Sequence, residues 1–244
     1  MRTSALARSI RWAAAGIGIA VAGYAACAGL AWSRYGRVVP AASPEEQDEL
    51  LDRFMPAYDV VERHHVRVAA PAGITFAAAQ EMDLLGSPIV RALVRTREAI
   101  LGAAPDERPR PAGLLAETQA LGWGVLAEIP GREVVVGAVT RPWEASVTFR
   151  ALPPEEFAAF REPGYVKIAW TLRADPLGPT ASVFRTETRA IATDDAARAR
   201  FRRYWALASP GIVLIRWVSL PPLRRDAERR AGDAVLAAVG GRGV

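Results

Sequence analysis

The stretch SVFRTETRAIATDDAARARFRRYW, residues 182–205, decides the fold because it joins a strand directly to a helix. From Val183 to Ile191 the side chains alternate with the period of two that is typical of a half-buried strand. One face carries Phe184 among small and hydroxyl-bearing residues. The other face is charged and is expected to point to water; it carries Arg185, Glu187 and Arg189.

A helix is predicted to begin directly after this strand. Thr193-Asp194-Asp195 supplies a capping side chain, and acidic groups are favourable at the positive end of a helix dipole. Pro210-Gly211 is predicted to bend this helix, and Pro221-Pro222 to break it before residues 223–238 resume it. Between the prolines lies IVLIRWVSL, residues 212–220. This stretch is either an amphipathic element on an anionic membrane surface or the buried part of a helix that covers the sheet.

Upstream, the pattern predicts one strand, several short helices and a run of further strands. Ser43-Pro44 and Ser87-Pro88 are typical helix starts, and Pro130-Gly131-Arg132 predicts a hairpin turn. The predicted strands are 58–69, 123–129, 133–140, 145–150 and 165–173, and the predicted helices are 43–54, 73–83, 87–101, 113–120 and 153–160.

This order of elements predicts an α+β fold. An antiparallel sheet must bury one face, and the C-terminal helix is the one predicted element long enough to cover it. We therefore expect the sheet to grip the long C-terminal helix. Such a sheet can leave an apolar cavity between itself and the helix.

Two stretches resemble the START-like, or Bet v 1-like, superfamily, whose bacterial members are often called SRPBCC or polyketide cyclase/dehydrase proteins. ERHHVRVAAPAGITFAAAQEMDL, residues 62–84, resembles its first strand and first helix. Residues 182–205 resemble its last strand and the start of its long helix, and the proline interruptions depart from the pattern. The resemblance covers about residues 58–230. It implies a pocket for a hydrophobic ligand, here in a membrane-anchored branch, but no reaction, because one fold hosts many functions.

An N-terminal transmembrane helix is predicted from residues 12–32, which carry no charged side chain. A helix of this length crosses the roughly 30 Å hydrocarbon core of a bilayer. Trp12 and Trp32 stand where interfacial aromatic residues are found. A cleaved signal peptide and a lipoprotein signal ending at Cys27 remain as alternatives.

The flanking charges predict how this anchor is oriented. Three arginines and the amino terminus precede the segment and two arginines follow it, which favours an internal N-terminus and an extracytoplasmic domain at the cell membrane. We divide the chain into a single-pass anchor, a linker with a short helix, a helix-grip domain and a tail. Their bounds are 1–37, 38–57, 58–232 and 233–244.

The net charge of +5 belongs to the N-terminal region. Residues 1–40 carry five arginines and no acidic residue, so the other 26 basic residues are balanced by the 26 acidic ones. A nucleic-acid partner is therefore not expected. The single cysteine excludes an intrachain disulfide and a multi-thiolate metal site. No phosphate-binding or zinc-hydrolase motif is present, so no cofactor and no metal are expected.

The candidate ligand-binding residues are the polar and aromatic groups expected near the cavity. His64 shares its strand face with Val66 and Val68, whereas His65 lies on the opposite face, so the pair cannot chelate one metal. His64 is either a hydrogen-bonded strand residue or a group that contacts ligand as a general base. Residues 141–144 form either a clamp for an anionic head group or a loop salt bridge. The candidates are His64, Trp123, Arg141, Trp143, Glu144, Trp170, Phe184 and Tyr204.

Three functions remain open at this point. The first is membrane-tethered binding of a lipid or other hydrophobic small molecule in an internal cavity. The second is an enzyme of the cyclase/dehydratase type that uses a cavity histidine or carboxylate as its base. The third is a non-catalytic structural or interaction domain whose groove is filled by its own side chains. The sequence leaves the ligand and the oligomeric state undetermined.

Overall fold

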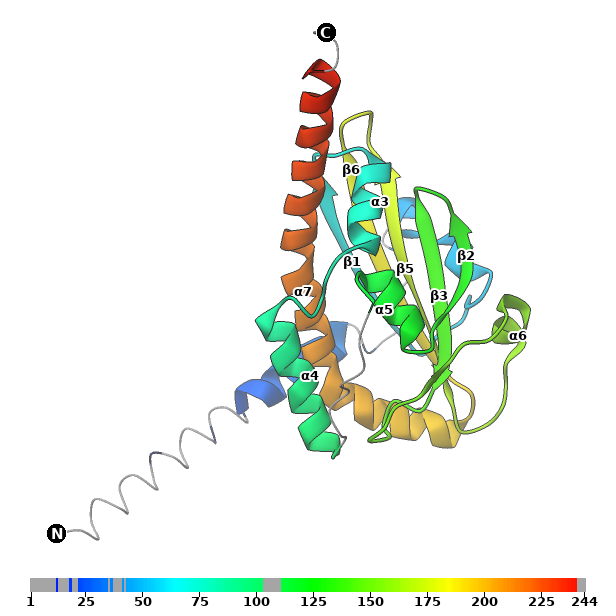
Figure 1. Cartoon of the computed structure of the whole chain (residues 1–244). Coiled ribbons are helices and arrows are strands. Elements are labelled where there is room, and N and C mark those ends of the chain that lie inside the picture. The colour runs from blue at the N-terminus through cyan, green and yellow to red at the C-terminus, as the bar shows by residue number, and fades with distance from the viewer. Residues whose placement is uncertain are drawn as a thin grey trace, which may run out of the picture.

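The computed structural model describes residues 12, 18, 22–34, 36, 41, 43–102 and 111–240. Residues 22–34 are helical, and a short 3-10 turn, η1, follows at Pro44–Glu46 (Figure 1). The helices are α2 (Glu49–Asp52), α3 (Ala72–Gln80), α4 (Pro88–Leu101), α5 (Leu114–Ala120), α6 (Pro154–Ala159) and α7 (Asp195–Gly240). The strands are β1 (Val60–Val68), β2 (Gly124–Ile129), β3 (Glu133–Thr140), β4 (Phe149–Arg150), β5 (Val166–Pro176) and β6 (Ser182–Ala192).

The sheet is antiparallel and its strand order is β1-β6-β5-β3-β2, with β4 paired to the end of β3. The predicted strands are therefore confirmed, although β4 is shorter than the predicted 145–150. The predicted hairpin between β2 and β3 turns through Gly131, whose φ of 71° suits glycine. The first and last long strands of the domain, β1 and β6, lie side by side.

One face of the sheet, here called the inner face, is covered by α3, α5 and α7 (Figure 1). Phe76 of α3, Trp170 of β5, Phe184 of β6 and Leu223 of α7 belong to one buried cluster on this face. α7 runs along the β1 side of the sheet and contacts β1, β5, β6 and α3. The predicted α+β arrangement, an antiparallel sheet gripping a long C-terminal helix, is confirmed.

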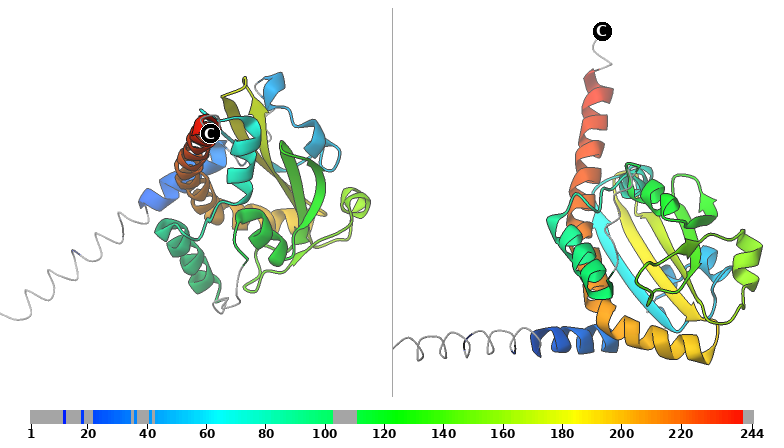
Figure 2. Two further views of the ribbon diagram at one scale, coloured as in Figure 1. Left: turned by 45° about the horizontal axis from the view of Figure 1, so that its top comes forward. Right: turned by 60° about the horizontal axis from the view of Figure 1, so that its bottom comes forward.

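The expected break at Pro221-Pro222 is wrong, because α7 continues through all three of its prolines to Gly240. A proline inside a helix costs about 3 kcal/mol, since it removes a backbone hydrogen bond and crowds the preceding turn. Burial offsets that cost here: Leu223 and Ala227, just after the proline pair, are 1% and 0% exposed in the inner core. Pro210 also lies inside α7. Figure 2 shows that the first part of α7 turns sharply away from the rest of the helix, which agrees with the bend predicted at Pro210-Gly211.

The prediction that the charged face of β6 points to water is also wrong. Glu187 and Arg189 are 5% and 3% exposed, because residues 43–58 cross over this outer face of the sheet. Arg189 donates from Nη1 to the backbone oxygen of Met55 at 2.8 Å and from Nε to Glu187 at 2.6 Å. The sheet is thus covered on both sides. The outer charges are stabilised by pairing, which buried ions require.

Of the predicted transmembrane segment 12–32, the structure describes residues 12, 18 and 22–32. Its helical end at residues 22–34 packs on the first part of α7, where Ala31 joins Phe201 and Trp205 in a buried cluster. Tyr24 donates a hydrogen bond to the backbone oxygen of Leu207, and the Arg202 guanidinium lies 5.8 Å from the Trp32 ring centroid. Among the described helices, α7 meets the length and hydropathy expected of a membrane span, and it also packs on the sheet.

Candidate ligand cavity

A cavity of about 260 Å³ lies between the inner face of the sheet and the bent part of α7. This volume is close to the lower limit of small-molecule pockets. Its wall is mainly apolar and aromatic. The lining residues are Val60, Arg97, Trp123, Pro142, Val147, Phe149, Ile168, Trp170, Thr188, Ala190, Phe201, Tyr204, Trp205, Ile212 and Arg216.

The sheet side of the wall follows from the strand register. Ala190 of β6 stands opposite Val60 of β1 and opposite Ile168 of β5, and Thr188 stands opposite Trp170. Directly opposed residues of neighbouring strands present their side chains to the same face. The short side chain of Ala190 therefore leaves space between larger neighbours, which is one reason why this part of the sheet is not filled.

The helix side of the wall is aromatic. Phe201 and Trp205, one helical turn apart on α7, have ring centroids 5.9 Å apart, and Tyr204 lies 6.4 Å from Phe201. The Nε1 of Trp205 is buried and has no hydrogen-bond partner. A buried donor without a partner costs about 1–3 kcal/mol. Trp205 therefore carries a buried N–H group that would gain from an acceptor.

Arg216 of α7 supplies the positive charge in the wall. Its Nη2 donates to Thr188 Oγ1 at 3.1 Å, and its guanidinium carbon lies 5.6 Å from the Trp170 ring centroid. Burial lowers the pKa of Arg216, although the nearby charge of Glu62 acts in the opposite direction. A guanidinium does not lose its proton in a protein. The charge is therefore retained on a half-buried side chain in a mostly apolar wall.

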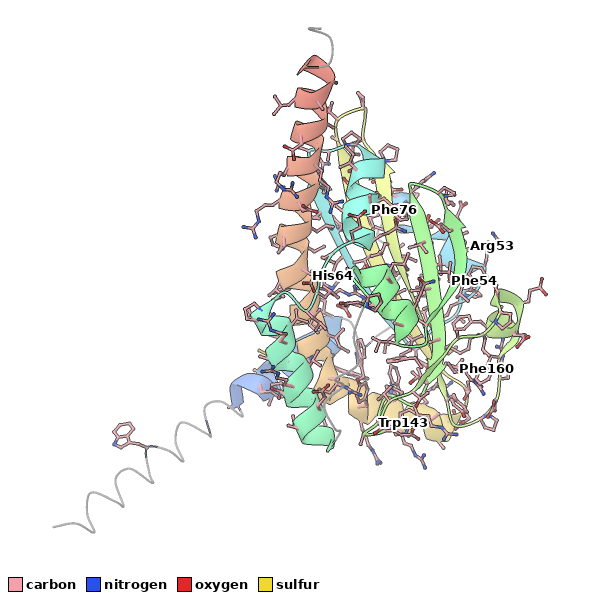
Figure 3. All side chains as sticks on the ribbon, viewed as in Figure 1. Arg53, Phe54, His64, Phe76, Trp143 and Phe160 are labelled. Carbon is pink, nitrogen blue, oxygen red and sulfur yellow. The ribbon has the colours of Figure 1, made fainter. Side chains whose placement is uncertain are left out.

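Glu62 and His64 lie next to this group on β1. His64 Nε2 is 2.7 Å from Glu62 Oε1, and these residues are 8% and 1% exposed. The register places Glu62 opposite Thr188 and His64 opposite Thr186. Glu62 Oε2 and Thr186 Oγ1 are buried without hydrogen-bond partners. Figure 3 shows His64 between the sheet and α7.

The structure brings part of the predicted site together. Trp123, Trp170 and Tyr204 line the cavity. Trp123 packs edge to face on Trp170 with centroids 6.3 Å apart. Phe184 lies in the inner core, and His64 faces inward but is not among the lining residues. His65 is exposed on the other side of β1, as its parity predicts.

The loop after β3 is arranged as a local ion pair. Arg141 and Glu144 are half-exposed, with nitrogen and oxygen 3.6 Å apart. Arg141 Nε donates to the backbone oxygen of Gly164, and its guanidinium stacks 4.3 Å from the Tyr165 ring centroid. Trp143 packs on the cluster around Phe201 (Figure 3). Pro142 reaches the cavity wall, while ligand contact by its charged neighbours stays a prediction.

Sequence reasoning missed Arg216, Glu62, Thr188 and Trp205 Nε1 as polar groups of this site. Glu62 had a usable signal, since it shares its strand face with Val60 and Val66. An acidic residue in such a row is a candidate buried carboxylate. For Arg216 the sequence signal was weak: it is the one charged residue in the apolar stretch 212–220.

A second group of buried titratable residues lies on the outer face. Burial raises the pKa of Glu133 to about 8, and the neighbouring Asp48 adds to the effect. Burial also lowers the pKa of Lys167 to about 8, and its Nζ donates to the backbone oxygen of Ala158 at 3.0 Å. These groups lie on the far side of the sheet from the cavity. In the described part of the chain, no three histidine, cysteine or acidic side chains are grouped to hold a metal.

Comparison with known proteins places two enzymes among the structural neighbours. No family model and no curated protein matches the chain. A point mutant of norcoclaurine synthase from Thalictrum flavum, solved with a transition-state analogue, is 11% identical; the alignment covers 70% of this chain and 94% of the synthase, with a TM-score of 0.33. Zhui aromatase/cyclase from Streptomyces sp. R1128 is 16% identical over 70% of this chain and 94% of the cyclase, with a TM-score of 0.23. Both have Bet v 1-like folds, but likenesses this distant carry no argument about function.

Proposed function

We propose that this chain binds a lipid or other hydrophobic small molecule in the cavity between the sheet and α7, while its N-terminal segment tethers it to a membrane. The observation that carries the proposal is the cavity itself, which is about 260 Å³ in volume and walled mainly by aromatic and aliphatic side chains. An apolar ligand removes that surface from water, which stabilises the complex by about 25 cal/mol per Å².

The position of residues 22–34 supports the tether. This helix is the end of the apolar segment 12–32, and Ala31 and Trp32 pack on the cluster that contains Phe201 and Trp205. The same two aromatic residues line the cavity. A segment anchored in a bilayer would therefore hold the cavity close to the lipid phase, so that an apolar ligand enters with little exposure to water. The flanking charges favour an extracytoplasmic domain.

The test is to purify the full chain from membranes and analyse what it retains. We expect one apolar molecule per chain in the organic extract by mass spectrometry, and less of it in Ala190→Leu, which fills the cavity. An empty protein whose melting temperature does not respond to added lipids would contradict ligand binding. A reporter fused after Val244 that is active only outside the cytoplasm would support the orientation.

A cyclase/dehydratase-type enzyme is the second candidate, and the Glu62–His64 hydrogen bond favours it. A carboxylate that orients an imidazole is a common arrangement for a general base. The test compares the molecules retained by the wild-type chain and by His64→Gln. An enzyme leaves product on the wild-type chain and substrate on the variant, so the two masses differ. A binding protein retains the same molecule in both, which would exclude this candidate.

A purely structural domain is the third alternative, and nucleic acid is not among the proposed partners. A structural domain predicts an interior filled by its own side chains, and a cavity of about 260 Å³ does not favour it. Failure to retain any ligand, together with loss of a partner protein on substitution of cavity residues, would favour this alternative.

Nucleic acid is not proposed as a partner because, in our proposal, the excess of arginines in the N-terminal region orients the membrane anchor.

A further inference from the structure

Resting on the proposed function, we infer that the cavity selects amphiphiles with a carboxylate head group, held by Arg216 beside Thr188 while the carbon chain lies along the aromatic wall. The argument starts from how arginines are satisfied elsewhere in this domain. On the outer face, Arg63 and Arg189 both pair with Glu187, and Arg173 and Arg185 pair with Asp175. Each of these partly or fully buried charges has a carboxylate in contact.

Arg216 differs from these arginines. Within the described residues, it forms no ion pair and a single hydrogen bond, to Thr188 Oγ1. A guanidinium carries five N–H donors in a fixed planar fork, and that of Arg216 is half-buried in the cavity wall. Trp170 lies 5.6 Å away, where a ring quadrupole stabilises the cation but accepts no conventional hydrogen bond. In the part of the chain that the structure describes, most of the donors of Arg216 therefore have no acceptor.

Glu62 is a candidate counter-ion for Arg216, but the two residues do not form an ion pair. Its Oε1 is hydrogen-bonded to His64, and no oxygen of Glu62 lies within ion-pair distance of Arg216 among the described residues. Its charge still acts on Arg216 across this short gap. The charge of Glu62 thus stabilises the half-buried cation without occupying its fork, which leaves the guanidinium available to a ligand.

The chemistry of that ligand follows from the wall around Arg216. A carboxylate matches the planar fork with two parallel hydrogen bonds, and such bonds are stronger than those between neutral groups. The remaining wall, from Trp170 and Ile168 to Phe201 and Ile212, is apolar and suits a hydrocarbon chain. The small volume favours a medium-length chain. A ligand with both parts satisfies the charge and the apolar surface together.

The experiment compares two probes of equal chain length, decanoate and decanol, by isothermal titration calorimetry. The full chain is held in phospholipid nanodiscs, and the heat from empty nanodiscs is subtracted. For the wild-type chain we expect decanoate to bind at least tenfold more tightly than decanol, which corresponds to about 1.4 kcal/mol. Arg216→Met should remove this preference, so that this variant binds decanoate no more tightly than decanol. Arg203→Met, an exposed arginine on the same helix, should leave both affinities unchanged.

The outcomes separate this inference from the function on which it rests. If the wild-type chain binds both probes equally, or if Arg216→Met keeps the preference for decanoate, head-group selection is wrong and apolar binding stands. If neither probe binds, the proposed function fails as well. Should Arg216→Met fail to fold, Thr188→Val provides the test, because it keeps the shape and removes the hydroxyl that holds the guanidinium. We expect it to weaken decanoate binding about threefold, and an unchanged affinity would overturn the inference.

Discussion

Trp123 meets Trp170 edge to face, with ring centroids 6.3 Å apart, so that a half-buried residue and a buried one form one wall of the cavity. Trp123 also packs on Phe149 of β4 at 4.9 Å. The pair links the short strand β4 and the loop before β2 to the centre of the sheet. We therefore expect Trp170 to contribute more to stability and Trp123 to contribute mainly to ligand contact.

Substitution of these two tryptophans separates binding from stability. Trp170 is 6% exposed, and Trp170→Ala should lower the free energy of unfolding by about 3–5 kcal/mol, as expected for a large aromatic residue removed from a core. Trp123→Ala should cost less stability and weaken binding of an apolar probe several-fold. Urea unfolding and probe titration measure the two effects. Equal loss of stability in both variants would contradict this division.

Two alanines on the inner face should respond in opposite ways to the same change. Ala190 borders the cavity, so Ala190→Leu should fill it, reduce ligand binding at least tenfold and leave the melting temperature nearly unchanged. Ala174 is fully buried in the packed inner core, so Ala174→Leu should overpack it and cost about 1–3 kcal/mol. Calorimetric melting and ligand retention distinguish the two. A large loss of stability in Ala190→Leu would mean that this site has no free volume.

The unpartnered N–H of Trp205 predicts an effect that depends on the ligand. Trp205→Phe keeps an aromatic ring and removes the buried donor, so the ligand-free protein should be no less stable, or gain up to about 1 kcal/mol. A ligand that carries a hydrogen-bond acceptor should bind more weakly to this variant, and a plain hydrocarbon should not. Thermal unfolding with and without each ligand measures this. A marked loss of stability without ligand would show that the N–H is satisfied in solution.

Glu133 on the outer face predicts a pH dependence of stability. Its pKa in the folded chain is raised to about 8 by burial and by Asp48, above its ordinary value of 4.5. Between pH 5 and pH 8 the folded state therefore holds a proton that the unfolded state has released, and stability falls as the pH rises. The slope from this group is at most about 1.4 kcal/mol per pH unit.

Glu133→Gln should remove this contribution, so its stability relative to the wild-type chain should increase from pH 5 to pH 8. Urea unfolding at several pH values measures the difference. Glu128→Gln is the matched control, because Glu128 is exposed on the neighbouring strand and should leave the pH profile unchanged. Parallel profiles for Glu133→Gln and the wild-type chain would contradict the raised pKa.

Local patterns were sufficient to predict most of the elements. The alternation in 183–191, the turn at Pro130-Gly131 and the Ser87-Pro88 helix start each act within a few residues, and β6, the β2–β3 hairpin and α4 follow from them. The helix break predicted at Pro221-Pro222 is wrong because the tertiary packing of Leu223 and Ala227 outweighs the cost of proline inside a helix. A sequence window does not contain that packing energy.

The candidate site was predictable only in its apolar part. Trp123, Trp170 and Tyr204 were expected from their size and spacing, and all three line the cavity. Arg216 and Glu62 interact across 154 positions of sequence, so their proximity depends on the fold. The burial of Arg189 likewise depends on residues 43–58 crossing the outer face, which strand periodicity cannot reveal.

The first part of α7 has a consequence for how this chain can vary. Phe201 and Trp205 face the cavity and also support Ala31 of the N-terminal helix, so each belongs to two surfaces at once. A substitution of Phe201 or Trp205 that changes the shape of the cavity will therefore also disturb the packing of the N-terminal helix on α7. Among related sequences, we therefore expect positions 24–32 and 197–213 to change together.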